Sequence, residues 1–221
     1  LSLEALGRER EALEAYGGLL QRYPDFVPGL YNCGLLLLRL ERPARAREVT
    51  GQLLRHAPSH PGGLMNQARA LEMGKRPDEA AGYYRRLTEV DGAPPGMRCR
   101  AWYRLIHIRW EQKQWAGVAE ACRALAGECP VNVDTSLVWA AALRRLGRLQ
   151  AAQARLQKSL ATVPETDRGV RGRLHLELAR VALARRRPAQ ARRHYRTALD
   201  HGAPPDNQLA DELQMLSPTP P

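Results

Sequence analysis

The amino-acid sequence predicts an all-α protein in which helical hairpins stack into a solenoid. Alanine, leucine and arginine dominate the 221 residues, and aromatic residues contribute only 5%, a composition that favours helix over an all-β fold. A small residue followed four positions later by a larger one recurs about every 34 residues, which is typical of repeat architectures. A hydrophobic content of 44% supplies a packed core, and the apolar runs are too short to span a membrane, so we expect a soluble chain.

Six residue pairs mark the repeating unit, and prolines end its second helix. Successive pairs are 34, 34, 38, 34 and 39 residues apart, so three intervals are identical and two contain a short insertion. In four units a proline follows eight residues after the pair, where it prevents the helix from continuing. We expect the insertions, at residues 95–98 and 167–171, to lengthen the loops before two helices. The pairs are Ala12/Tyr16, Ala46/Thr50, Ala80/Tyr84, Val118/Cys122, Ala152/Leu156 and Ala191/Tyr195, and the prolines are Pro24, Pro58, Pro130 and Pro164.

Turns between the two helices of each unit complete the pattern. Gly7, Gly74 and Gly147 lie at three of these turns, where glycine can adopt the left-handed conformation that ends a helix. Pro43 and Pro77 fit the first turn of the helix that follows. Residues 206–216 place leucines along one face, which predicts a last helix that covers the final unit. The expected helices lie at about 1–6, 9–22, 27–40, 43–56, 61–74, 77–90, 97–112, 115–128, 133–146, 149–162, 170–185, 188–201 and 206–216.

This arrangement resembles the tetratricopeptide repeat family, whose 34-residue helix–turn–helix units carry W-x2-L-G-x2-Y, A-x3-F and proline motifs. The resemblance covers nearly the whole chain, is greatest to bacterial members, and implies a right-handed superhelix of about six repeats. Ile106 stands where the family carries a small residue. The implied repeats are 1–26 (partial), 27–60, 61–94, 99–132, 133–166 and 172–205, within a solenoid spanning 1–216 that ends in a capping helix at 206–216, followed by a proline-rich tail at 217–221.

No catalytic, metal-binding or cofactor-binding pattern stands out, so we expect neither an enzyme nor a cofactor. His56 and His60 are separated by Pro58, and therefore cannot share a helix face as zinc ligands would. The chain has no glycine-rich motif of the phosphate-binding kind. His175 falls at a packing position of its repeat, where we expect a half-buried, hydrogen-bonded histidine.

Four cysteines, Cys33, Cys99, Cys122 and Cys129, lack the C-x-x-C spacing of a zinc or redox site. We expect small buried or loop thiols, and the alternatives are a Cys122–Cys129 disulfide or a reactive thiol. Thiols favour a reducing compartment, hence the cytoplasm, with the periplasm as the alternative.

The resemblance implies that function lies on the concave surface, which the first helix of every repeat lines. Asn32 and Asn66 are one repeat apart there, and asparagine amides can hold the backbone of an extended peptide, similar to the asparagine ladder of O-linked N-acetylglucosamine transferase. The predicted groove residues are Tyr31, Asn32, Arg39, Met65, Asn66, Arg69, Arg100, Tyr103, Arg104, His107, Trp110, Arg144, Arg145, Arg173 and Arg180.

A partial second resemblance is to the carboxylate clamp of co-chaperone tetratricopeptide domains. Asn66, Arg100 and Arg104 match three of that clamp's five positions, whereas Tyr31 and Leu35 stand where a lysine and an asparagine are expected. A terminal-carboxylate clamp therefore remains an alternative to a general groove for an acidic, extended peptide.

The positive charge of the chain is concentrated in one segment. Residues 141–200 hold 15 Lys or Arg against four Asp or Glu, whereas the formal charges of all other residues sum to zero. Such a patch could attract an acidic protein or an anionic membrane surface. We do not expect a nucleic-acid partner, because the aromatic residues needed for base stacking are missing around the patch. The predicted patch consists of Arg185, Arg186, Arg187, Arg192, Arg193 and Arg196.

Together these features predict a non-catalytic scaffold or adaptor that binds an extended, acidic segment of a partner protein. The first alternative is a recruitment arm of a larger enzyme, such as a glycosyltransferase, a sulfotransferase or a polysaccharide-export protein, because the sequence begins inside a helical pattern. The second alternative is a basic module that associates with nucleic acid or a membrane. The first, partial repeat is the end expected to pair if the chain forms a homodimer.

Overall fold

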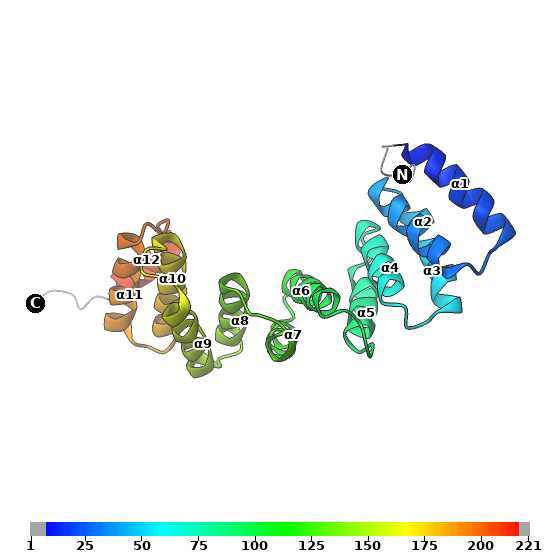
Figure 1. Ribbon diagram of the computed structural model, residues 1–221. Coiled ribbons are helices and arrows are strands. Elements are labelled where there is room, and N and C mark those ends of the chain that lie inside the picture. The colour runs from blue at the N-terminus through cyan, green and yellow to red at the C-terminus, as the bar shows by residue number, and fades with distance from the viewer. Residues whose placement is uncertain (1–7, 217–221) are drawn as a thin grey trace, which may run out of the picture. The chain divides into compact units, whose positions relative to one another are not determined.

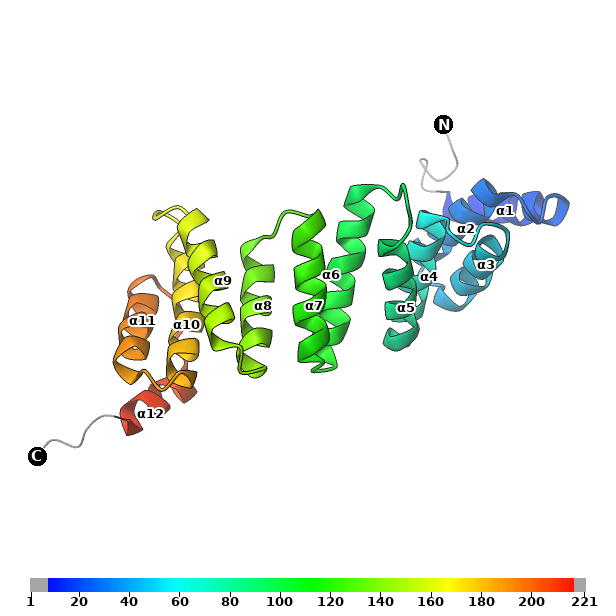
Figure 2. The same cartoon turned by 90° about the horizontal axis from the view of Figure 1, so that it is seen from below.

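The computed structural model describes residues 8–216, and every regular element within them is an α-helix (Figures 1 and 2). The expected all-α class is confirmed, whereas the helix expected at 1–6 and the tail at 217–221 lie outside the described residues. Among residues 8–216, the helices are all too short or too polar to cross a lipid bilayer. The helices are α1 (Glu9–Arg22), α2 (Val27–Arg39), α3 (Pro43–His56), α4 (Pro61–Met73), α5 (Pro77–Thr88), α6 (Pro95–Glu111), α7 (Trp115–Glu128), α8 (Val133–Arg145), α9 (Leu149–Thr162), α10 (Arg168–Ala184), α11 (Pro188–Asp200) and α12 (Asn207–Met215).

The helices form two compact units, an N-terminal unit (residues 1–111) and a C-terminal unit (residues 112–221). In the N-terminal unit, α2 pairs with α3 and α4 pairs with α5, as neighbouring antiparallel helices. Prolines occupy the first turns of α3, α4 and α5. Backbone N–H groups in a first turn have no intrahelical acceptor, so proline costs no hydrogen bond there. The pair residues Ala80 and Tyr84 are fully buried, as the repeat pattern predicts.

The turns between paired helices differ in detail from the expectation. Gly147 has φ +71°, so the left-handed conformation expected of a glycine is confirmed at that turn. At the turn between α4 and α5 the expectation is wrong. Gly74 caps α4 with φ −81°, and it is Lys75 that takes the left-handed conformation, with φ 56°. A non-glycine residue there is less favourable locally, and the packing of the hairpin outweighs that preference.

The sequence pattern predicted that the two insertions lengthen loops, but they lengthen helices α6 and α10 more than the loops before them. Helix α6 begins at Pro95 and α10 begins at Arg168, and each of these helices contains 17 residues, against 12 to 14 in most of the others. An insertion of four or five residues is close to one helical turn, so it extends a helix while leaving its buried face almost in register. Asp167 caps the extended α10 by accepting a hydrogen bond from the Val170 N–H at 3.3 Å.

In the C-terminal unit, helices α8, α9 and α10 enclose one hydrophobic cluster, which includes Leu156, Leu174 and Leu178. Helix α12 places Leu209 and Leu213 against alanines of α10 and α11, as expected of a capping helix. Leu216, expected on the same apolar face, is instead exposed, because α12 ends at Met215.

The cysteines correct one expectation. Cys99 and Cys129 are disulfide-bonded, whereas Cys33 and Cys122 are free and buried. The alternative of a Cys122–Cys129 disulfide is therefore wrong, and the argument from free thiols to a reducing compartment holds for only two of the four residues. Burial raises the pKa of the Cys122 thiol to about 12, so this residue is not a reactive thiol.

Candidate functional site

A cavity of about 590 Å³ opens between α4 and α6 in the N-terminal unit. We call it the α4/α6 groove. Its α4 residues recur three or four positions apart and so share one helix face. Five of the predicted groove residues meet here, namely Met65, Arg69, Arg100, Tyr103 and Arg104. Glu72, Met73 and Tyr84 complete the lining, and of these Tyr84 was expected as a packing residue of its repeat.

Glu72 holds Arg104 in a fixed position in this groove. The Arg104 Nε donates to Glu72 Oε2 at 3.0 Å, a second guanidinium nitrogen donates to the other carboxylate oxygen, and the Tyr84 hydroxyl donates to Oε2 at 2.5 Å. The Glu72 hydrogen bond raises the pKa of Arg104, and burial followed by Glu72 raises the pKa of Tyr84. Glu72 therefore neutralises the charge of Arg104, and the two guanidinium nitrogens that could grip a ligand carboxylate are already used in this bidentate pair.

Two other arginines of the groove keep their charge available. Arg69 is exposed, and neither it nor Arg100 pairs with a carboxylate of residues 8–216. The Arg100 Nε makes a long hydrogen bond of 3.3 Å to the Gly96 carbonyl, which leaves the guanidinium without a counter-charge. Met65 and Met73 lie beside these two cations, and the Met73 side chain is 41% exposed. The groove thus combines two uncompensated guanidinium groups with a flexible apolar wall.

The two asparagines of the expected ladder occupy different environments. Asn32 is exposed on α2, whereas Asn66 is only 2% exposed on α4. The Asn66 Nδ2 is buried and makes no hydrogen bond within the described chain. Buried amide groups nearly always form a hydrogen bond, so the Asn66 Nδ2 is an unusual donor that could bind an acceptor from a ligand or from water.

The remaining predicted residues of the N-terminal unit lie outside the groove lining. The Tyr31 ring packs near His60, with 5.5 Å between ring centroids, and Arg39 pairs with Glu9 at 3.3 Å. His107 is exposed and Trp110 is half-buried on the last turns of α6.

In the C-terminal unit, carboxylates of the chain itself engage the predicted groove arginines. Glu177, whose side chain is 6% exposed, accepts from Arg144 at 2.8 Å and from Arg180 at 2.9 Å. Arg180 also reaches Asp206, the N-cap of α12, at 2.7 Å. Burial opposes ionisation of Asp206, but the Arg180 hydrogen bond prevails and lowers its pKa. Two carboxylates therefore occupy the place that an acidic ligand would take at Arg144 and Arg180.

The last two predicted residues of this unit are also engaged. Arg173 pairs with Asp134 at 2.5 Å. The Arg145 guanidinium lies 4.5 Å from the centroid of the Trp115 ring, and burial lowers its pKa. As binding residues these arginines stay predictions, but they are less available than Arg69 and Arg100.

The predicted basic patch is partly used for internal contacts. Arg185 donates to the Gln153 side chain, and Arg192 donates to the Leu213 carbonyl at 2.9 Å. Arg185 and Arg187 line a shallow cavity of about 600 Å³ together with Arg148 and the first turn of α9. Arg186, Arg193 and Arg196 are exposed.

Three histidines gather beside α11. The Nδ1 atoms of His175 and His194 lie 3.1 Å apart, and the His201 ring stacks on His175 with 5.8 Å between centroids. Burial, followed by the two neighbouring histidines, lowers the pKa of His175 to about 4. Within residues 8–216, no group of three or more His, Cys, Asp or Glu side chains has a geometry that could hold a metal ion.

Comparison with solved structures shows the fold. The YrrB crystal structure, described as a TPR protein with an unusual peptide-binding site, matches with a TM-score of 0.70 and 15% identity over 92% of this chain and all of that one. MamA from Desulfovibrio magneticus RS-1 matches with a TM-score of 0.61 and 16% identity, covering 79% of this chain and 94% of the other. Naa15, in the Naa15/Naa10 complex bound to HypK-THB, matches with a TM-score of 0.69 and 16% identity, over 96% of this chain and 32% of the other.

Sequence comparison identifies the family. No curated protein matches the chain in sequence. Two profiles of the tetratricopeptide repeat match, one at residues 31–96 and 176–214 and the other at residues 1–25. These segments cover more than half of the 221 residues and agree with the period, the turn positions and the helix pairs described above. The chain therefore belongs to the tetratricopeptide repeat family.

Proposed function

We propose that this chain is a protein-binding scaffold whose α4/α6 groove holds an extended, acidic segment of a partner protein. The observation that carries the proposal is the pair Arg69 and Arg100, two guanidinium groups without a counter-charge beside an apolar wall. A carboxylate placed between them would form charge-assisted hydrogen bonds that neither arginine now makes.

The groove favours a segment that carries both an acidic and an apolar side chain. Met65, Met73 and Tyr103 offer an adaptable apolar surface next to the arginines. A cavity of about 590 Å³ accommodates a few residues of extended chain, whereas a helix with its side chains is about 10 Å across and needs a wider groove. The unpaired Asn66 Nδ2 lies on the same helix, one residue from Met65, and would be satisfied by a peptide carbonyl or by water after a small side-chain movement.

Two related structures support a protein partner. YrrB is described as having a peptide-binding site, and the Naa15 complex contains HypK-THB as a bound partner. Both share the fold of this chain at identities of 15–16%, so they support the class of ligand and not its sequence.

Affinity selection from a random peptide library tests the proposal. The immobilised wild-type chain should enrich peptides that carry a single Asp or Glu next to an apolar residue, and Arg69→Ala/Arg100→Ala should no longer enrich peptides of this class. Arg10→Ala/Arg22→Ala is the matched control, because it removes two exposed arginines of α1 that do not line the groove. Enrichment of the same peptides on the groove variant, or no enrichment of acidic residues on the wild type, would refute the proposal.

A further inference from the structure

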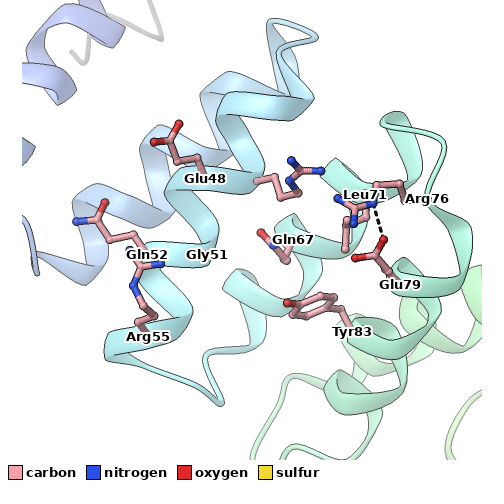
Figure 3. Close-up of a pocket in the computed structure, with 10 residues that line it drawn as sticks. Glu48, Gly51, Gln52, Arg55, Gln67, Leu71, Arg76, Glu79 and Tyr83 are labelled. Carbon is pink, nitrogen blue, oxygen red and sulfur yellow. Dashed lines mark ion pairs between the residues drawn. The ribbon is translucent and has the colours of Figure 1, made fainter.

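A second cavity of about 550 Å³ lies between α3 and α5, on surfaces that the α4/α6 groove does not use. We call it the α3/α5 pocket. Figure 3 shows Gln67 of α4 in its middle, with α3 side chains on one side and Tyr83 and Glu79 of α5 on the other. No residue lines both cavities.

Gly51 keeps this pocket open. It lies in the interior of α3, where glycine destabilises a helix by about 1 kcal/mol relative to alanine. A Cβ atom built on Gly51 meets no heavy atom within 4 Å. Packing inside the protein therefore gives no reason for glycine here, and a side chain at this position would project into the open space of the pocket.

Gln67 brings a buried polar group to the floor of the pocket. It is 6% exposed, and the Thr50 hydroxyl hydrogen-bonds to one end of its amide. That hydroxyl also donates to the Ala46 carbonyl at 2.7 Å, and a single proton cannot serve two acceptors. Whichever way the amide is turned, its other end has no partner in the described chain and lies at the pocket. One end of this nearly buried amide therefore remains open to water or to a bound peptide group at the pocket.

Two arginines flank the opening that Gly51 leaves. Arg47 and Arg55 precede and follow Gly51 by four residues, so they project from the same face of α3, about 12 Å apart along the helix axis. Neither arginine forms an ion pair with a carboxylate of residues 8–216. Glu79 is already paired with Arg76, as the dashed line in Figure 3 marks. Glu48, at the rim, can accept the backbone N–H of a bound chain.

We propose that the α3/α5 pocket is a second binding site, which takes an extended acidic peptide with two carboxylates three or four residues apart. Three or four residues of extended chain span about 10–14 Å, which matches the separation of Arg47 and Arg55. The peptide backbone crosses over Gly51 and pairs with the free end of the Gln67 amide. This site is independent of the α4/α6 groove and therefore does not rest on the proposed function.

A fluorescence anisotropy titration with a defined probe tests this site. The probe is a labelled, end-capped nonapeptide of glycine and serine with glutamate at positions 3 and 6, and the same peptide with glutamine is the control. Gly51→Gln should weaken binding of the glutamate probe at least tenfold, as should Arg47→Ala/Arg55→Ala. Gly17→Gln is the matched control, because a Cβ there also meets nothing within 4 Å and α1 does not line the pocket. Far-UV circular dichroism establishes that each variant is folded.

The outcomes separate this site from the groove. Arg69→Ala/Arg100→Ala should leave binding of the glutamate probe unchanged. Unchanged affinity in Gly51→Gln, or equal binding of the glutamine peptide, overturns the second site. Loss of the probe only in the groove variant also overturns it, and leaves the proposed function standing.

Discussion

The close approach of α2 and α3 makes Gly34→Ala the sharpest test of the packing described above. A Cβ on Gly34 would lie 2.6 Å from the Thr50 Cγ2, about 1 Å inside ordinary carbon–carbon contact. Thr50 is fully buried, and its hydroxyl bonds to the Ala46 carbonyl, so the methyl group cannot turn away. Overpacking of this kind costs about 1–3 kcal/mol. Alanine in a helix recovers about 1 kcal/mol, which leaves an expected net loss of up to about 2 kcal/mol.

The matched control is the same substitution where space is open. Gly51→Ala adds a Cβ that meets nothing within 4 Å, so it should stabilise the chain by about 0.5–1 kcal/mol. Urea unfolding followed by circular dichroism at 222 nm should therefore move the two midpoints in opposite directions. Thr50→Ser removes the Cγ2 atom and should restore part of the stability lost in Gly34→Ala, as a double-mutant cycle would measure. A Gly34→Ala midpoint as high as that of Gly51→Ala would show that the α2–α3 contact is wrong.

Three further predictions concern stability and reactivity. The pKa of His175 is lowered from 6.5 to about 4, so the unfolded chain binds the proton more readily. After a discount for solvent screening of this half-buried ring, the free energy of unfolding should fall by about 2 kcal/mol from pH 7 to pH 4, and denaturant midpoints of His175→Gln should lose that slope. Ala80→Leu, at a fully buried helix contact, should destabilise the chain by about 1–3 kcal/mol, and a thermal midpoint equal to wild type would mean that the repeat register is misplaced. Cys33 and Cys122 should resist a thiol reagent at pH 8 until denaturant is added, because both are buried and their pKa values are raised; rapid labelling of the native chain would contradict this burial.

Sequence periodicity predicts most helix boundaries to within one or two residues, because a 34-residue period and its prolines locate both ends of each hairpin. At residues 95–98 and 167–171 it places the helix starts two residues too late, since an insertion of about one turn reads equally as a longer loop or a longer helix. Pro95 at the first helical position of α6 is the local signal that favours the helix. The left-handed position at Lys75 was also missed, because glycine preference in the sequence points one residue earlier.

The sequence predicts which residues line the candidate site, but not which of its side chains form ion pairs with one another. Repeat register alone brings Met65, Arg69 and Arg100 into one cavity. It does not reveal that Glu72 binds Arg104, 32 residues away, because that pairing depends on side-chain conformations across two repeats. A glutamate one repeat away from a groove arginine is the signal that could have shown it. The disulfide-bonded state of two cysteines likewise depends on distances in space that spacing along the chain does not give.

Site-specific photocrosslinking from the groove tests the central claim most directly. A benzophenone amino acid replaces Met73, which lines the α4/α6 groove and is 41% exposed, or Leu199 of α11, which is 39% exposed and does not line it. Each chain is irradiated with the acidic peptide that the wild-type chain selects. We expect a covalent adduct from position 73 that disappears in Arg69→Ala/Arg100→Ala, and none from position 199. Equal adducts from both positions, or an adduct that survives loss of the two arginines, would contradict a peptide-binding groove between α4 and α6.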